Sequence, residues 1–236
     1  MSGYRQFKRG KTHAFGSADW DESKHARDKG KFAPKEGAGA EEDEPKKEGG
    51  GDGTTKGMVD GLRLSLGVPP FNDIRIGEPR DGGLMEVDYD GNLTINALAS
   101  RREVVDDAIG ENQRKYEESG GKGYATTFRN SEELIVHELG HHAAYVYAKQ
   151  HKLKQFWYAD RFGINNKAGF KSINQGKMTR GAKKEAAAIS HYASQDIHEA
   201  FAEVWTLDAT GRRDEVPEKY LSAVDELKDW LSKEPA

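Results

Sequence analysis

The segment from Ser131 to Gln150 constrains the fold of this chain more than any other, because a helix over it would have no side suited to water. Asn130 or Ser131 is expected to cap its start by accepting hydrogen bonds from the first helical turn. Apolar residues form one side, and histidines among small or apolar residues form the other: Ile135, Val136, Leu139, Ala143 and Val146 against Leu134, His137, His141, Ala144 and Ala148. A helix with this pattern is typical of the centre of a folded unit.

This predicted helix carries the sequence His137-Glu138-Leu139-Gly140-His141, which is an HExxH motif. Residues four apart lie on one face of a helix, so both imidazoles can reach the same ion. Glu138 projects about 100° away, where it can reach a water molecule rather than the ion. We interpret the histidines as metal ligands rather than as core histidines satisfied by hydrogen bonds. His142 points toward the apolar side and is predicted to be structural.

The chain contains no cysteine, so a zinc ion would have to be bound by histidines and carboxylates. Catalytic zinc usually has three protein ligands and one open position. Glu199 is the preferred third ligand, on a helix expected from about Asp196 to Ala209. His191 and His198 are rival ligands. A solvated acidic face, or a capping role of Glu199 toward Asp196, is the non-functional alternative.

A family resemblance becomes visible in these residues. HExxH followed by a helix of the form Glu-x-x-Ala-Glu resembles the gluzincin metallopeptidases, and the order Tyr192, Glu199, Phe201-Ala202-Glu203 is similar to the peptidase domain of anthrax lethal factor. The resemblance covers roughly residues 131–208. It implies that Glu199 is the third zinc ligand, that Tyr192 assists the reaction, and that Glu203 orients the first histidine. Tyr192 could otherwise be an ordinary half-buried tyrosine at a helix start.

The expected fold is α+β and zincin-like, with a small, mostly antiparallel sheet packed on the HExxH helix and on the Glu-bearing helix. Alternation at Ile74 and Ile76 predicts one strand. Two further strands, Met85–Tyr89 and Leu93–Ala97, flank Asp90-Gly91-Asn92, which is a strong hairpin signal. The strand Leu93–Ala97 is expected at the sheet edge, where it could pair with an extended substrate. Helices are also predicted from Arg101 to Glu118 and from Pro217 onward.

Residues 1–57 are predicted to be a disordered, charged and glycine-rich tail, and residues 58–236 to be the zinc metallopeptidase domain. Charged residues make up 32% of the chain and hydrophobic residues 35%, which favours an unpacked portion. The tail segment Trp20–Ala33 resembles a short element of bacteriophage head and portal-associated proteins; a charged linker is the alternative. The resemblance implies a phage or prophage gene and phage head proteins as partners of the tail.

Residues 149–184 are interpreted as a basic insertion that covers the cleft. Basic residues with aromatic residues between them also resemble single-strand nucleic-acid binding sites, although the net charge of −4 argues against such a partner. No stretch is long and apolar enough to cross a bilayer, and the N-terminus lacks the apolar core of a secretory signal. The expected location is therefore cytoplasmic, or virion-associated if the gene belongs to a phage.

These patterns together predict a zinc-dependent endopeptidase in which Glu138 is the general base for attack by a metal-activated water. Two alternatives stay open at this point. One is a DNA-associated zinc protease that uses residues 149–184. The other is a non-catalytic phage structural protein with a structural zinc ion, which would need a fourth protein ligand such as His191 or His198.

Overall fold

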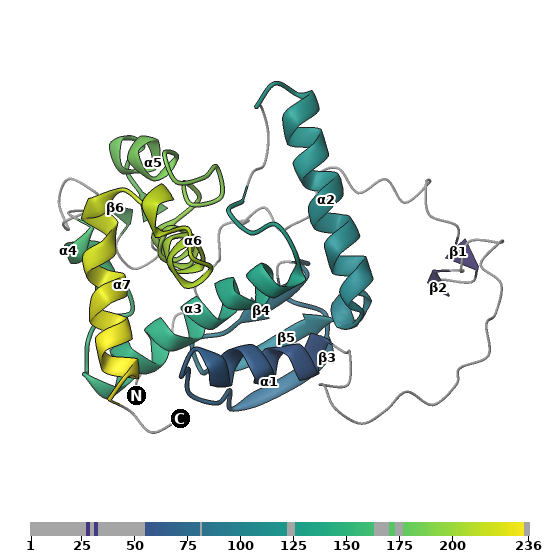
Figure 1. Ribbon diagram of the computed structural model, residues 1–236, viewed down its shortest axis with the longest axis horizontal. Helices are drawn as coiled ribbons and strands as arrows, with labels where there is room; N and C mark the ends of the chain where they lie inside the picture. Colours follow the sequence, from purple (N-terminus) through teal and green to yellow (C-terminus); the bar gives the residue numbers. More distant parts are fainter. Residues whose placement is uncertain are drawn as a thin grey trace, which may run out of the picture.

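A computed structural model of the 236-residue chain provides the structure. It describes residues 55–80, 82–121, 126–162 and 178–233 in full, and residues 27–28, 31–32, 170–172 and 177 by their backbone. The fold is α+β, with seven helices and one three-stranded sheet among the described residues (Figure 1). No helix within the described part of the chain has the length and apolar character needed to cross a membrane.

The helices and short strands follow one another in small groups along the chain. The helices are α1 (Thr55–Ser65), α2 (Arg102–Glu118), α3 (Ser131–Gln150), α4 (Tyr158–Arg161), α5 (Arg180–Ala186), α6 (Ile197–Ala209) and α7 (Glu218–Leu231). The strands are β1 (Arg27–Asp28), β2 (Lys31–Phe32), β3 (Asp73–Gly77), β4 (Met85–Val87), β5 (Asn92–Asn96), β6 (Phe170–Ser172) and β7 (Lys177–Met178). The 3₁₀ turns Leu98–Ser100 and Arg213–Glu215 complete the regular structure.

The sheet confirms the predicted hairpin but corrects its surroundings. Strands β4 and β5 pair antiparallel around Gly91, whose φ of +87° is the left-handed conformation that a tight turn requires. Strand β3 pairs with β5 in parallel, so the sheet is mixed and the expectation of a mostly antiparallel sheet is wrong. The hairpin signal identifies only a local pair of strands, whereas the pairing of β3 with β5 joins segments that β4 separates in the chain, which no local signal specifies.

Strand β5 lies in the middle of the sheet, not at its edge. The strand order is β3-β5-β4, and three consecutive side chains of β5, Leu93, Thr94 and Ile95, are buried. The expectation that Leu93–Ala97 forms an edge for substrate is therefore wrong. The edge strand that packs against α3 is β4.

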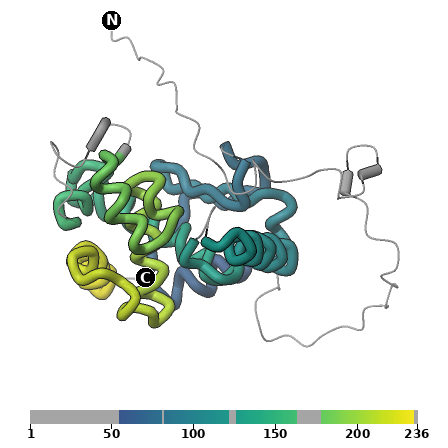
Figure 2. Tube along the Cα trace, turned by 90° about the horizontal axis from the view of Figure 1, so that it is seen from above, coloured from purple at the N-terminus to yellow at the C-terminus, as the bar shows by residue number. Residues whose placement is uncertain are grey.

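Helix α3 is the central helix of the molecule, as its pattern predicts. Fifteen of its twenty residues are buried, and it packs against α1, α2, α6, α7 and β4 (Figure 1). Asn130 caps it by accepting a hydrogen bond from the N–H of Glu133 at 2.9 Å. Helices α2 and α7 stand on opposite sides of this centre, where both are seen nearly end-on in Figure 2.

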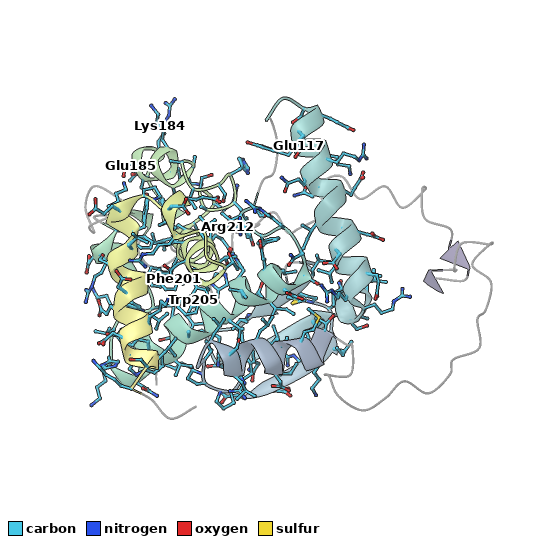
Figure 3. The ribbon with its side chains drawn as sticks, viewed as in Figure 1. Glu117, Lys184, Glu185, Phe201, Trp205 and Arg212 are labelled. Carbon is cyan, nitrogen blue, oxygen red and sulfur yellow. The ribbon has the colours of Figure 1, made fainter. Side chains whose placement is uncertain are left out.

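The crossing of α3 and α6 depends on Gly140, the fourth residue of the HExxH motif. A Cβ atom at this position would lie 2.6 Å from Cδ1 and 2.9 Å from Cγ of Trp205 on α6. Trp205 is 1% exposed and lies where α6 crosses α3 in Figure 3. The absent side chain therefore allows the two helices that carry the candidate ligands to approach closely.

The N-terminal part of the chain differs from the sequence prediction in two respects. Helix α1 begins at Thr55, whose hydroxyl donates a hydrogen bond to the carbonyl of Ala99 at 2.7 Å, so folded structure starts before residue 58. In the predicted tail, β1 and β2 pair antiparallel; the other residues of 1–54, including most of the phage-like segment, lie outside the described residues.

The first part of the predicted basic insertion, up to residue 162, contributes side chains to the hydrophobic core instead of forming a solvated segment over the cleft. Its buried residues are Trp157, Tyr158, Ala159 and Phe162, each 4% exposed or less. The interpretation as a solvated insertion is wrong for this part, because its aromatic side chains fill the space between α3, α6 and α7. Residues 163–169 and 173–176 of the stretch lie outside the described residues.

Candidate metal centre

Two histidines of α3 and one carboxylate of α6 converge on a single point. Nε2 of His137 lies 3.1 Å, and Nε2 of His141 3.5 Å, from Oε2 of Glu199. One potential ligand atom from each residue lies within 4.8 Å of the other two. This is the one such group found among the described residues, and it could hold a metal ion.

The two separations from Glu199 are compatible with a shared metal ion of the size of zinc. Ligands at 2.0–2.1 Å in a tetrahedral arrangement are separated from one another by roughly 3.3 Å, and the two measured separations from Glu199 lie on either side of that value. The histidines are 1% and 7% exposed, whereas the Glu199 side chain is 19% exposed. The donors are therefore held by the core and remain accessible from one side.

The electrostatics of the group favour a cation. Burial by itself would lower the pKa of His137, but the interactions with the carboxylates of Glu199 and Glu203 outweigh it and raise this pKa to about 10. Burial likewise opposes ionisation of Glu199, yet the neighbouring His141 and His137 hold the pKa of this carboxyl well below its usual range. The site thus keeps its carboxylate ionised and attracts positive charge, whether a proton or a metal ion.

The first turn of α6 places Glu199. Asp196 caps the helix by accepting hydrogen bonds from the N–H groups of His198 at 2.8 Å and Glu199 at 3.1 Å. The side chain of Glu199 is directed at the histidines of α3. The capping interaction at this turn is therefore made by Asp196, and Glu199 remains available as a ligand.

Glu203, one turn further along α6, lies behind His137. It is fully buried, and its Oε2 accepts a hydrogen bond from the N–H of Thr127 at 2.7 Å. Its Oε1 is 3.4 Å from Nδ1 of His137, slightly beyond good hydrogen-bond geometry, and neither atom has another partner among the described side chains. A small adjustment would join them, which is the arrangement expected when Nε2 of a histidine binds a metal.

Glu138 lies outside the ligand group. It is 7% exposed, and its Oε2 accepts a hydrogen bond from the N–H of Val87 on β4 at 3.2 Å. The helical period turns this carboxylate away from the ligands, as the motif implies, and toward the sheet edge.

Tyr192 lies beside His137, the first histidine of the group. Its half-buried ring stacks on His137, with centroids 5.6 Å apart and planes inclined by 23°. Phe128 contacts both rings edge-on, at 6.4 Å from Tyr192 and 5.4 Å from His137. The fold therefore places Tyr192, as the sequence predicts, next to a histidine of α3 from which it is distant in the chain.

The other histidines do not belong to the ligand group. His191 is exposed in the turn before α6, and Nδ1 of His198 lies 2.6 Å from the hydroxyl of Tyr158. His142 is structural, as predicted: its Nε2 lies 3.1 Å from the carbonyl oxygens of Pro69 and Pro70. Burial lowers the pKa of His142 to about 4, so it is neutral.

Sequence reasoning missed the aromatic residues on the His141 side. Tyr145 stacks on His141 with centroids 6.1 Å apart, and Phe156 and Tyr158 surround His198. The signal for the last two is the run Phe156-Trp157-Tyr158 shortly after the HExxH helix. From the sequence, this run is assigned to a basic insertion over the cleft, with a nucleic-acid surface as the alternative. Because Trp157 and Tyr158 are buried, they cannot stack with bases.

Comparisons with protein-family models, with curated proteins and with solved structures gave no match for this chain. The description of the site therefore depends on its own geometry.

Proposed function

We propose that this protein is a zinc-dependent endopeptidase of the gluzincin type. The observation that supports this best is the His137, His141 and Glu199 group, with the carboxylate of Glu138 beside it but outside it. Three protein ligands are typical of a catalytic zinc site, whereas a structural site usually has four. The described residues supply three, which favours an enzyme over a protein with a structural zinc ion.

The roles of the residues follow from their positions. A bound zinc ion would polarise the scissile carbonyl group and lower the pKa of a water molecule toward neutrality. Glu138 accepts the proton of the attacking water and transfers it to the leaving amine. Tyr192, beside His137, donates a hydrogen bond to the carbonyl oxygen as negative charge develops on it. Glu203 accepts the Nδ1 proton of His137 and so keeps Nε2 directed at the ion.

Strand β4 is the segment best placed to hold a substrate. It is the sheet edge that packs against α3, and its Val87 donates its N–H to Glu138. An extended peptide can add to such an edge through main-chain hydrogen bonds. A peptide paired with β4 in this way would have its scissile bond close to Glu138, the proposed general base.

The test combines metal analysis with digestion of a peptide library. Glu138→Gln should keep bound zinc and lose at least about 100-fold in kcat, because it removes the base while the ligands remain. Glu132→Gln is the matched control: it makes the same chemical change on the same helix, at a side chain that is 49% exposed. Full activity of the Glu138 variant, or a wild-type protein without affinity for zinc, would contradict the proposal.

A further inference from the structure

His198 lies next to the third ligand and has no part in the proposed mechanism. Its ring packs against Phe156 with centroids 4.4 Å apart, and it meets Tyr145 edge-on at 5.6 Å. The ring centroid of the metal ligand His141 is 6.4 Å away. His198 is therefore a fixed, polar side chain on the His141 side of the centre, whereas Tyr192 lies on the His137 side.

The hydrogen bond with Tyr158 determines where the proton of His198 is located. The hydroxyl of Tyr158 lies 2.6 Å from Nδ1, and its residue is 1% exposed. A phenol is protonated at neutral pH, so it donates to Nδ1, and the neutral imidazole carries its proton on Nε2. Tyr145, whose hydroxyl is 3.5 Å from the same Nδ1, faces this nitrogen too. Both tyrosines therefore occupy one end of the ring and leave the other end as an N–H donor.

The second ring nitrogen of His198, Nε2, is the one that the two tyrosines leave unpaired. No described residue makes a hydrogen bond to it, and it is not one of the buried polar atoms that lack a partner. His198 as a whole is half-buried. A histidine whose role was only to fill the core would have its second nitrogen paired, whereas Nε2 of His198 has no hydrogen-bond partner among the described residues and remains a donor for a bound group.

We propose that His198 contacts the substrate, and that its Nε2–H donates a hydrogen bond to a backbone carbonyl oxygen of the peptide on the His141 side of the metal centre. The inference rests on the proposed endopeptidase function. It gives the site two donors, Tyr192 and His198, on opposite sides of the histidine pair. Tyr158 is then a positioning residue, because it acts on the substrate through the proton position of His198.

The test uses the zinc-loaded full chain and a peptide selected by digestion with the wild type. His198→Phe keeps the ring but removes the donor, and kcat/KM should fall about 10- to 100-fold with zinc content unchanged. His198→Gln places an amide N–H near the former Nε2 and should recover a large part of this loss. Tyr158→Phe should cause a smaller loss and shift the histidine ¹⁵N resonances of labelled protein away from a pure Nε2–H tautomer.

Several results would overturn the inference. An unchanged kcat/KM in His198→Phe, or a fall explained by an equal loss of zinc, would assign His198 a structural role. A wild type that binds zinc but cleaves no peptide would instead refute the proposed function. In that case the contact is tested by binding: the affinity for a short peptide hydroxamate is measured for the zinc-loaded wild type and for His198→Phe. The variant should bind about tenfold more weakly, and equal affinities of the two proteins would refute the contact.

Discussion

Replacing Gly140 by alanine tests whether tertiary packing outweighs local helix preference, because the two predict opposite effects on stability. In the interior of an exposed helix this change stabilises by about 1 kcal/mol, because alanine loses less backbone entropy than glycine. At Gly140, however, the new methyl group would lie 2.6 Å from Cδ1 of Trp205, well inside van der Waals contact. The indole is 1% exposed, so neighbouring atoms enclose it and it cannot turn out into solvent.

The packing cost should exceed the local gain. Overpacking of a dense core costs about 1–3 kcal/mol or more, and the backbones of α3 and α6 would have to separate to relieve this contact. We expect a net loss of about 2 kcal/mol, which corresponds to a fall in Tm of roughly 4–8 °C for a domain of this size. Because Glu199 and the histidines lie on the two helices, the separation should also weaken zinc binding.

Thermal unfolding in chelator and in excess zinc measures both effects. Gly110→Ala is the matched control, because Gly110 lies within α2 and a Cβ atom there would have no atom within 4 Å. The control should keep zinc affinity and gain up to about 1 kcal/mol. If Gly140→Ala were as stable as this control, the close approach of α3 and α6 would not depend on glycine and the reasoning would be refuted.

Three further predictions concern the proposed third ligand, the carboxylate behind His137 and one buried tyrosine. Glu199→Ala should lower zinc occupancy in elemental analysis; full occupancy would require a different third ligand. Glu203→Gln should weaken zinc affinity about 10- to 100-fold in a competition titration, because His137 loses its carboxylate partner, and unchanged affinity would count against that role. Burial and Glu226 raise the pKa of Tyr147 to about 12, above the unfolded value near 10. Stability should therefore fall as pH rises from 10 to 12, and Tyr147→Phe should remove this part of the pH dependence in chemical denaturation.

Much of the candidate site could be predicted because its parts are encoded locally. The two histidines share one face because of the helical period, and the apolar or small residues on both sides of that helix predict its central position. Asn130 and Asp196 identify the starts of two helices through the hydrogen bonds that their side chains can accept. Gly91 predicts the hairpin because a tight turn between two strands requires a positive φ, which glycine adopts readily.

Only the tertiary structure decided which of these local elements meet. Glu199 reaches the histidines because α6 packs on α3 at Gly140, and this contact joins residues 62 apart in the chain. The hydrophobic pattern of a helix or strand specifies a face to be buried, but many other segments could cover that face. The parallel pairing of β3 and the bond from Tyr158 to His198 are set by such long-range packing, which no local period encodes.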